Sequence, residues 1–138
     1  MKRLLFSTRI YAIDAALLLL RAASSLMIFT HGWPKIANFS DYLNRFADPL
    51  GLGPALSLQA TIFAEFFCAI LVALGLLTRL ALIPLIITMA TVVFIIHGGD
   101  AFGDKELPLL YLFAFVVLFI TGPGKYSLDK RIIRKNPF

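Results

Sequence analysis

The stretch that decides the fold is LLLLRAASSLMIFTHGWPK, residues 17–35. It is apolar enough to lie in a bilayer, yet it contains Arg21, His31 and Lys35. On a helix, at about 100° per residue, Arg21, Gly32 and Lys35 fall on one face. A helix face that carries charged side chains is energetically costly in a membrane unless it faces other protein or a water-filled cavity. The stretch therefore predicts a membrane-spanning helix whose polar face packs against partner helices.

The composition of the whole chain is that of an integral membrane protein. Of its 138 residues, 59% are hydrophobic, whereas soluble domains are about 45–50% apolar. The length suits one domain over residues 1–138. We attribute the net charge of +5 to the charge bias of membrane proteins. No basic run is interleaved with aromatic residues, so we expect no nucleic-acid partner. Cys68 is the single cysteine, which excludes an intrachain disulfide.

Hydropathy predicts four membrane spans separated by polar breaks. Between the first two, over residues 36–53, apolar residues recur every three to four positions, which predicts a short interfacial helix. The fold class is therefore all-α, an integral membrane four-helix bundle with a short interfacial helix between spans one and two. A 16-residue fourth span would be about 24 Å long, short for a hydrocarbon core of about 30 Å. The expected spans are residues 12–33, 55–77, 80–97 and 106–121.

The distribution of Lys and Arg predicts the orientation of these spans. Four spans place both termini on one side, and that side holds nine of the 13 Lys and Arg residues. The opposite side holds three, and Arg21 lies within a span. Because cytoplasmic segments carry the excess of positive charge, we expect both termini in the cytoplasm.

Arg21 in span one and Glu65 in span two are expected at similar depths near the middle of the membrane. A charge there costs about 2.5–3.5 kcal/mol on insertion scales, so we expect the two to pair. One interpretation is a buried ion pair that only fixes helix register. The other is a charge site for an anionic or quinone-type ligand, or for protons.

Four further polar residues are expected together at the outer ends of the spans. Histidine titrates near neutral pH and can pass protons, while Lys and Glu could hold a polar head group. In the alternative interpretation these charges only extend to the membrane surface. Their spacing matches no common metal motif, so we predict no metal site and assign no catalytic residue. The four residues are His31, Lys35, His97 and Glu106.

Three motifs and their order resemble a known family. They are F-x-H-G-x-x-K at residues 29–35, G-L-L-T-R at residues 75–79 and G-P-G-K-Y-S-L-D at residues 122–129. With Arg21 and Glu65 placed in spans one and two, the chain resembles the DoxX family of small four-span bacterial membrane proteins. The family is named for a subunit linked to thiosulfate:quinone oxidoreductase. The resemblance implies a multi-pass protein of the bacterial inner membrane, in contact with the lipid bilayer and with a protein partner in a membrane complex.

These observations lead to one expected function and two alternatives. We expect a quinone-linked or redox-complex membrane subunit, an accessory to an oxidoreductase. The sequence has no haem, flavin or iron–sulfur signature, so quinone is the candidate cofactor. The alternatives are a non-catalytic scaffold or chaperone, and a solute or proton pathway that requires homo-oligomers. An open pocket at the histidines would favour binding. The ligand-binding or proton-transfer residues would be Arg21, His31, Lys35, Glu65, His97 and Glu106.

Overall fold

The computed structural model of the protein describes residues 12–135, and this part of the chain is helical with no strand. The basic segment at residues 1–11, part of the charge bias noted above, lies outside the described residues. Two of the helices contain π-helical turns, η1 and η2, each continuous with the α-helices beside it. The elements are α2 (Ile13–Ala37), α3 (Phe39–Leu43), α4 (Pro54–Ile62), η1 (Phe63–Cys68), α5 (Ala69–Leu74), α6 (Thr78–Thr91), η2 (Val92–Ile96), α7 (Phe102–Thr121) and α8 (Leu128–Lys135).

Three helical segments of the described chain are long and apolar enough to cross a membrane, namely Ile13–Ala37, Pro54–Leu74 and Thr78–Ile96. They match the first three expected spans to within a few residues. The helix α7 begins at Phe102, four residues before the expected start, and its 20 residues give it a length of about 30 Å. It is long enough to cross, but its first two turns carry Asp104, Lys105 and Glu106, so the fourth span stays a prediction.

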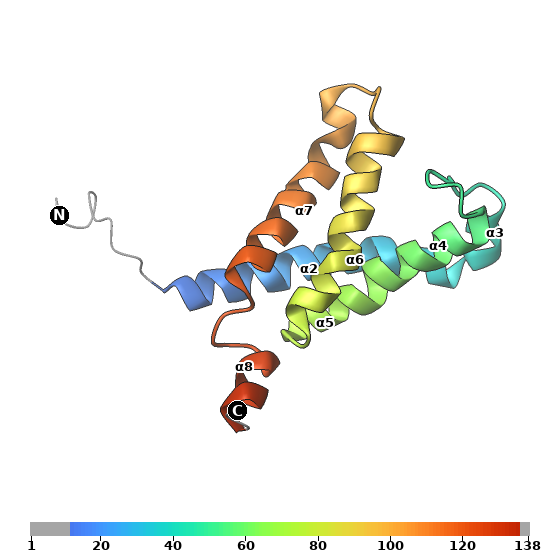
Figure 1. Cartoon of the computed structure of the whole chain (residues 1–138). Helices are drawn as coiled ribbons and strands as arrows, with labels where there is room; N and C mark the ends of the chain where they lie inside the picture. The colour runs from blue at the N-terminus through green and yellow to red at the C-terminus, as the bar shows by residue number, and fades with distance from the viewer. Residues whose placement is uncertain (1–11, 136–138) are drawn as a thin grey trace.

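The long helices form two antiparallel pairs that cross (Figure 1). In one pair, α2 lies beside the continuous helix α4–η1–α5. In the other pair, α6 lies beside α7. The pairs meet near the turn between α5 and α6, and their other ends diverge toward α3 and toward the 98–101 loop. The far ends of the two pairs are therefore spread apart.

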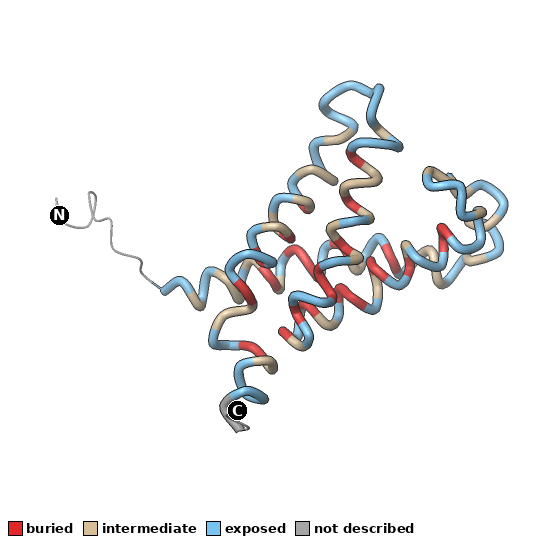
Figure 2. The backbone as a smooth tube through the Cα atoms, viewed as in Figure 1, coloured by how far each residue is buried: buried red, intermediate tan, exposed pale blue. Residues whose placement is uncertain are grey.

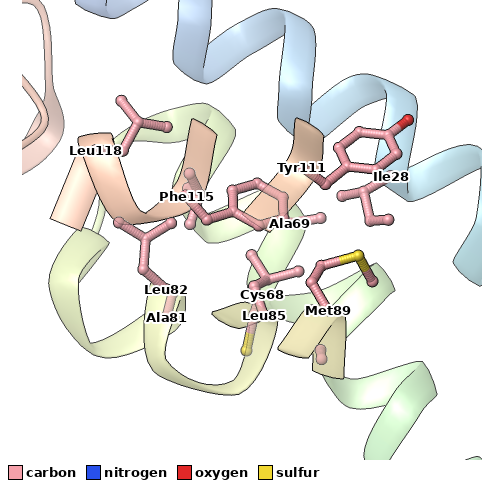
Figure 3. Packing of buried hydrophobic residues seen from close by; sticks show 12 residues of the cluster. Ile28, Cys68, Ala69, Ala81, Leu82, Leu85, Met89, Tyr111, Phe115 and Leu118 are labelled. Carbon is pink, nitrogen blue, oxygen red and sulfur yellow. The ribbon is translucent and has the colours of Figure 1, made fainter. Parts of the chain in front are cut away.

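The apolar core lies where the two pairs cross (Figure 2). Leu82 and Leu85 of α6 and Phe115 and Leu118 of α7 have no exposed surface. They pack on Ala69 at the start of α5 (Figure 3), and its small side chain permits close helix contact. Many large apolar side chains face outward instead, among them Leu19, Phe94 and Ile120. An outer surface of this kind suits contact with lipid.

Arg21 is only 1% exposed, and the C-terminal segment accepts hydrogen bonds from its guanidinium. Its Nη1 donates to the carbonyl oxygen of Pro123 at 2.7 Å, and its Nη2 donates to that of Tyr126 at 2.9 Å. A buried guanidinium needs several acceptors, and backbone carbonyls provide two of them, while the Nε has no partner among the described residues. The contact ties the first half of α2 to the segment that follows α7.

Asp129 completes the same junction from the start of α8. Its carboxylate accepts hydrogen bonds from the backbone N–H groups of Leu77 at 2.7 Å and Thr78 at 2.9 Å, and from the Thr78 hydroxyl at 2.8 Å. In return its own N–H donates to the Gly75 carbonyl at 2.8 Å. These bonds cap the N-terminus of α6, whose first N–H groups lack helical partners. We call Arg21, residues 75–78 and residues 123–129 the tail clasp.

Gly75 gives a test of the tail clasp. A Cβ at this residue would lie 2.5 Å from Arg21 Nη1 and 2.6 Å from Ser127 Cβ, at a φ of +71°. Gly51 has a similar φ of +68° but nothing within 4 Å of an added Cβ. Both alanine variants should have backbone strain of about 1–2 kcal/mol. We expect Gly75→Ala to lose roughly another 1–3 kcal/mol from the clash, measured as thermal stability in detergent. Equal losses in the two variants would contradict the clasp.

Candidate functional site

Glu65 pairs with Lys35, not with Arg21. The Lys35 ammonium donates to Glu65 Oε2 across the contact between α2 and η1. The side chains of Lys35 and Glu65 are 16% and 5% exposed, so the pair is largely buried. The predicted Arg21–Glu65 pair is therefore wrong. Arg21 lies 14 residues before Lys35 on α2, about 21 Å along the helix, and its acceptors are the carbonyls of the tail clasp.

Gly32 allows α2 to approach the backbone beside Glu65. A Cβ added at Gly32 would lie 2.9 Å from the carbonyl carbon of Glu65 and 3.0 Å from the amide nitrogen of Phe66. Only a residue without a side chain fits such a contact. The approach brings Lys35, three residues further along α2, within reach of the Glu65 carboxylate.

Both π-helical segments border this ion pair. Glu65 lies inside η1, and η2 ends at its C-cap, His97. π-helical turns widen a helix by one residue per turn and occur often at functional sites. Hydropathy and helical periodicity do not reveal them, so the sequence analysis missed this feature.

Two cavities flank the ion pair. One of about 280 Å³ lies between the 46–52 segment, α4–η1 and α6–η2, and we call it the loop-side cavity. The other, of about 270 Å³, lies between α2, η2 and α7, and we call it the α7-side cavity. The residues that line both cavities are Lys35, Glu65, Val92 and His97.

Two aromatic side chains lie on the wall of the α7-side cavity. His31 of α2 and Tyr111 of α7 line it, with ring centroids 6.3 Å apart in an edge-on arrangement. The sequence analysis did not single out Tyr111. The sequence signal that could have identified it is a single tyrosine within the apolar sequence of α7. A hydroxyl group in an otherwise apolar helix suggests a functional role.

His97 is oriented by a carboxylate. Its Nδ1 lies 2.8 Å from Asp100 Oδ2, and the His97 side chain is 33% exposed. A carboxylate can only accept, so Nδ1 carries the proton and Nε2 is left as an acceptor in the neutral ring. A ring held in this way is suited to proton exchange with a bound ligand.

Asp48 orders the segment over the loop-side cavity. Its carboxylate accepts from the Ser57 hydroxyl at 2.7 Å and from the N–H groups of Gly53 at 2.8 Å and Leu52 at 2.9 Å. These bonds, with the one from Ser57 foremost, hold the pKa of Asp48 below its usual value. Asp48 thus stays charged near neutral pH and holds the neighbouring Pro49 and Leu50 at the cavity wall.

Four of the six predicted site residues come together, since His31, Lys35, Glu65 and His97 line the α7-side cavity. Glu106 is exposed on the first turns of α7, and among the described residues neither it nor Arg21 lines either cavity. In residues 12–135 no group of three or more His, Cys, Asp or Glu side chains is placed to hold a metal ion.

A double-variant series tests the ion pair. Glu65→Leu alone leaves the Lys35 ammonium without its partner, and breaking a buried pair costs about 3–5 kcal/mol of stability. We expect Lys35→Met, added to Glu65→Leu, to restore most of the loss in thermal stability. The matched control adds Arg21→Met to Glu65→Leu and should make the protein less stable still. Rescue by the Arg21 change and not by the Lys35 change would contradict the pairing.

Comparisons with known proteins agree in pointing to one family. The sequence model of the DoxX family matches residues 16–98. Inner membrane protein YphA of Escherichia coli is 35% identical over 83% of this chain and 89% of its own length. Inner membrane protein YqjF of the same organism is 30% identical over 88% of this chain and 95% of its own length.

A third relative is the uncharacterized membrane protein Rv3486 of Mycobacterium tuberculosis, 31% identical over 70% of this chain and 74% of its own length. No solved structure matches the chain significantly. The family match covers more than half of the chain, and the relatives match along most of their length. On this evidence the chain is a membrane protein that belongs to the DoxX family.

Proposed function

We propose that this protein is a membrane subunit that binds a quinone or a related head group between its diverging helix pairs. The observation that carries the proposal is the Lys35–Glu65 ion pair with a cavity on each side. A pair that served only to join helices needs no space beside it. Each cavity is close to the roughly 300 Å³ at the lower end of small-molecule sites.

The lining of the cavities suits an amphipathic ligand. Quinone carbonyls accept hydrogen bonds, and the Lys35 ammonium and the Tyr111 hydroxyl are donors at the α7-side cavity. The loop-side cavity is largely apolar and includes Ile87 and Ile96, which are 54% and 42% exposed on the outer surface. An apolar tail attached to the head group would leave the site over these two residues and enter the lipid.

The same place offers groups that can carry protons. Reduction of a quinone to a quinol takes two electrons and two protons. An imidazole can both donate and accept a proton, and His31 and His97, the latter held by Asp100, line the α7-side cavity. Electrons would come from a partner oxidoreductase, so the protein would act as an accessory subunit and not as a complete enzyme.

We also propose four spans with both termini in the cytoplasm, and α3 as a short helix at the opposite membrane surface. The 20 residues of α7 and the excess of Lys and Arg on the terminal side support this arrangement. The Lys35–Glu65 site then lies toward the outer face.

Two fusions test this orientation. Reporters joined after Phe138 and inserted at residues 98–101 should report opposite sides of the membrane, with the first cytoplasmic. If both report the same side, α7 does not cross the membrane and the four-span arrangement is wrong.

The two histidines test the binding proposal. His31→Gln with His97→Gln keeps hydrogen bonding but removes the two imidazoles, so neither residue can carry a proton. We expect this double variant to fold with normal thermal stability but to lose quinone, measured by extraction and mass spectrometry of the purified protein. The control is Glu106→Gln, an exposed change on the first turns of α7, which should retain the wild-type amount.

The opposite result would favour the alternative function. If the double variant folds normally and retains the same small molecules at every pH, the histidines are architectural and the binding site does not depend on them. If wild type itself carries no quinone, a scaffold or chaperone for other membrane proteins would replace the binding proposal.

A further inference from the structure

A third cavity lies at the end of the molecule away from the ion pair. It has a volume of about 750 Å³ and lies where α6 begins and α8 packs against the tail clasp. This end of α6 follows directly from the turn after α5, so it marks one edge of a membrane-spanning helix. In the proposed membrane arrangement, on which this step rests, the cavity would lie where lipid head groups meet the acyl chains.

The charges around this cavity leave an excess of positive charge. Asp129 is fully engaged by the N-terminus of α6. Asp14 accepts from the Lys125 N–H at 2.8 Å and lies 3.5 Å from the Lys125 ammonium. The remaining cations on the wall are Arg79 and Lys130.

Arg79 and Lys130 are available to an added anion. Arg79 makes one long hydrogen bond, 3.4 Å from its Nη2 to the Ile120 carbonyl. The Lys130 side chain is exposed, and no described residue accepts a hydrogen bond from its ammonium. The two come from different elements, α6 and α8, and converge on one cavity. That convergence distinguishes them from surface cations scattered along a helix.

The rest of the wall is apolar and faces outward. Leu77 and Leu80 at the start of α6 are 55% and 64% exposed, and Ile132 and Ile133 of α8 are 51% and 57% exposed. All four line the cavity. A cationic pair beside an exposed apolar wall at a helix end matches a molecule with an anionic head and hydrocarbon chains.

We propose that this cavity binds an anionic phospholipid. Its phosphate would lie between Arg79 and Lys130, and its acyl chains would lie along Leu77, Leu80 and Ile133. Three cations and two carboxylates line the wall, and this net positive charge favours an anionic lipid over a zwitterionic one. The apolar wall favours a lipid over free phosphate. A lipid held here would join α8 to the start of α6 and reinforce the tail clasp.

The test uses the full chain in detergent and native mass spectrometry. Phosphatidylglycerol or phosphatidylcholine is added at matched concentrations, and bound lipid is counted. We expect wild type to prefer phosphatidylglycerol. Each charge-assisted hydrogen bond to the phosphate contributes roughly fivefold or more in affinity, so Arg79→Gln with Lys130→Gln should lower the affinity on the order of 20-fold. Inorganic phosphate at the same concentration should not displace the lipid.

Arg131→Gln is the matched control, because Arg131 is exposed on the same helix but does not line the cavity. It should lower phosphatidylglycerol binding by less than about twofold. Equal losses in Arg131→Gln and Lys130→Gln would show general charge attraction and overturn the site. Displacement by inorganic phosphate, or no preference between the two lipids, would overturn it as well. A melting curve for each variant shows that any loss of lipid is not unfolding.

Discussion

The fold depends on how one buried guanidinium is satisfied. Arg21 is buried on α2, and its acceptors are carbonyls from a segment more than a hundred residues away in sequence. An arginine on a membrane-spanning helix is costly in lipid, so the carbonyls of the tail stabilise α2. Gly75 leaves the space for the guanidinium, and Asp129 caps the next helix. Two of the three motifs by which the chain resembles the family, at residues 75–79 and 122–129, thus build one junction that closes the end of the molecule near α8.

Because the tail clasp closes the end near α8, the polar residues at the opposite end can have a role other than joining helices. The two helix pairs diverge there, and the Lys35–Glu65 pair lies between two cavities at the point where they separate. Arg21 is held by the hydrogen bonds of the tail clasp and lines neither cavity beside the ion pair, whereas Lys35 and Glu65 line both. This contrast favours an architectural role for Arg21 and supports the proposal that Lys35, Glu65 and the two histidines bind a ligand.

Hydropathy was enough to predict the three apolar spans, since a run of apolar residues must form its hydrogen bonds internally in a membrane. The expected grouping of His31, Lys35 and His97 is present, but Glu65 and not Glu106 lies with them. The prediction failed on the partners of the charged residues, because similar depth says nothing about which face of a helix points where. The prediction considered only side chains as partners for Arg21, whereas its acceptors are backbone carbonyls. The π-helical turn around Glu65 and the role of Gly32 depend on packing between helices. The periodicity of residues within one helix gives no information about that packing.

A high-resolution structure of the protein extracted with its native lipids would test the central claim most directly. The account predicts Lys35 Nζ bonded to Glu65, Arg21 on the carbonyls of Pro123 and Tyr126, and non-protein density in the cavities beside the ion pair. Glu65 bonded to Arg21, or cavities that are closed and empty around an intact Lys35–Glu65 pair, would contradict it.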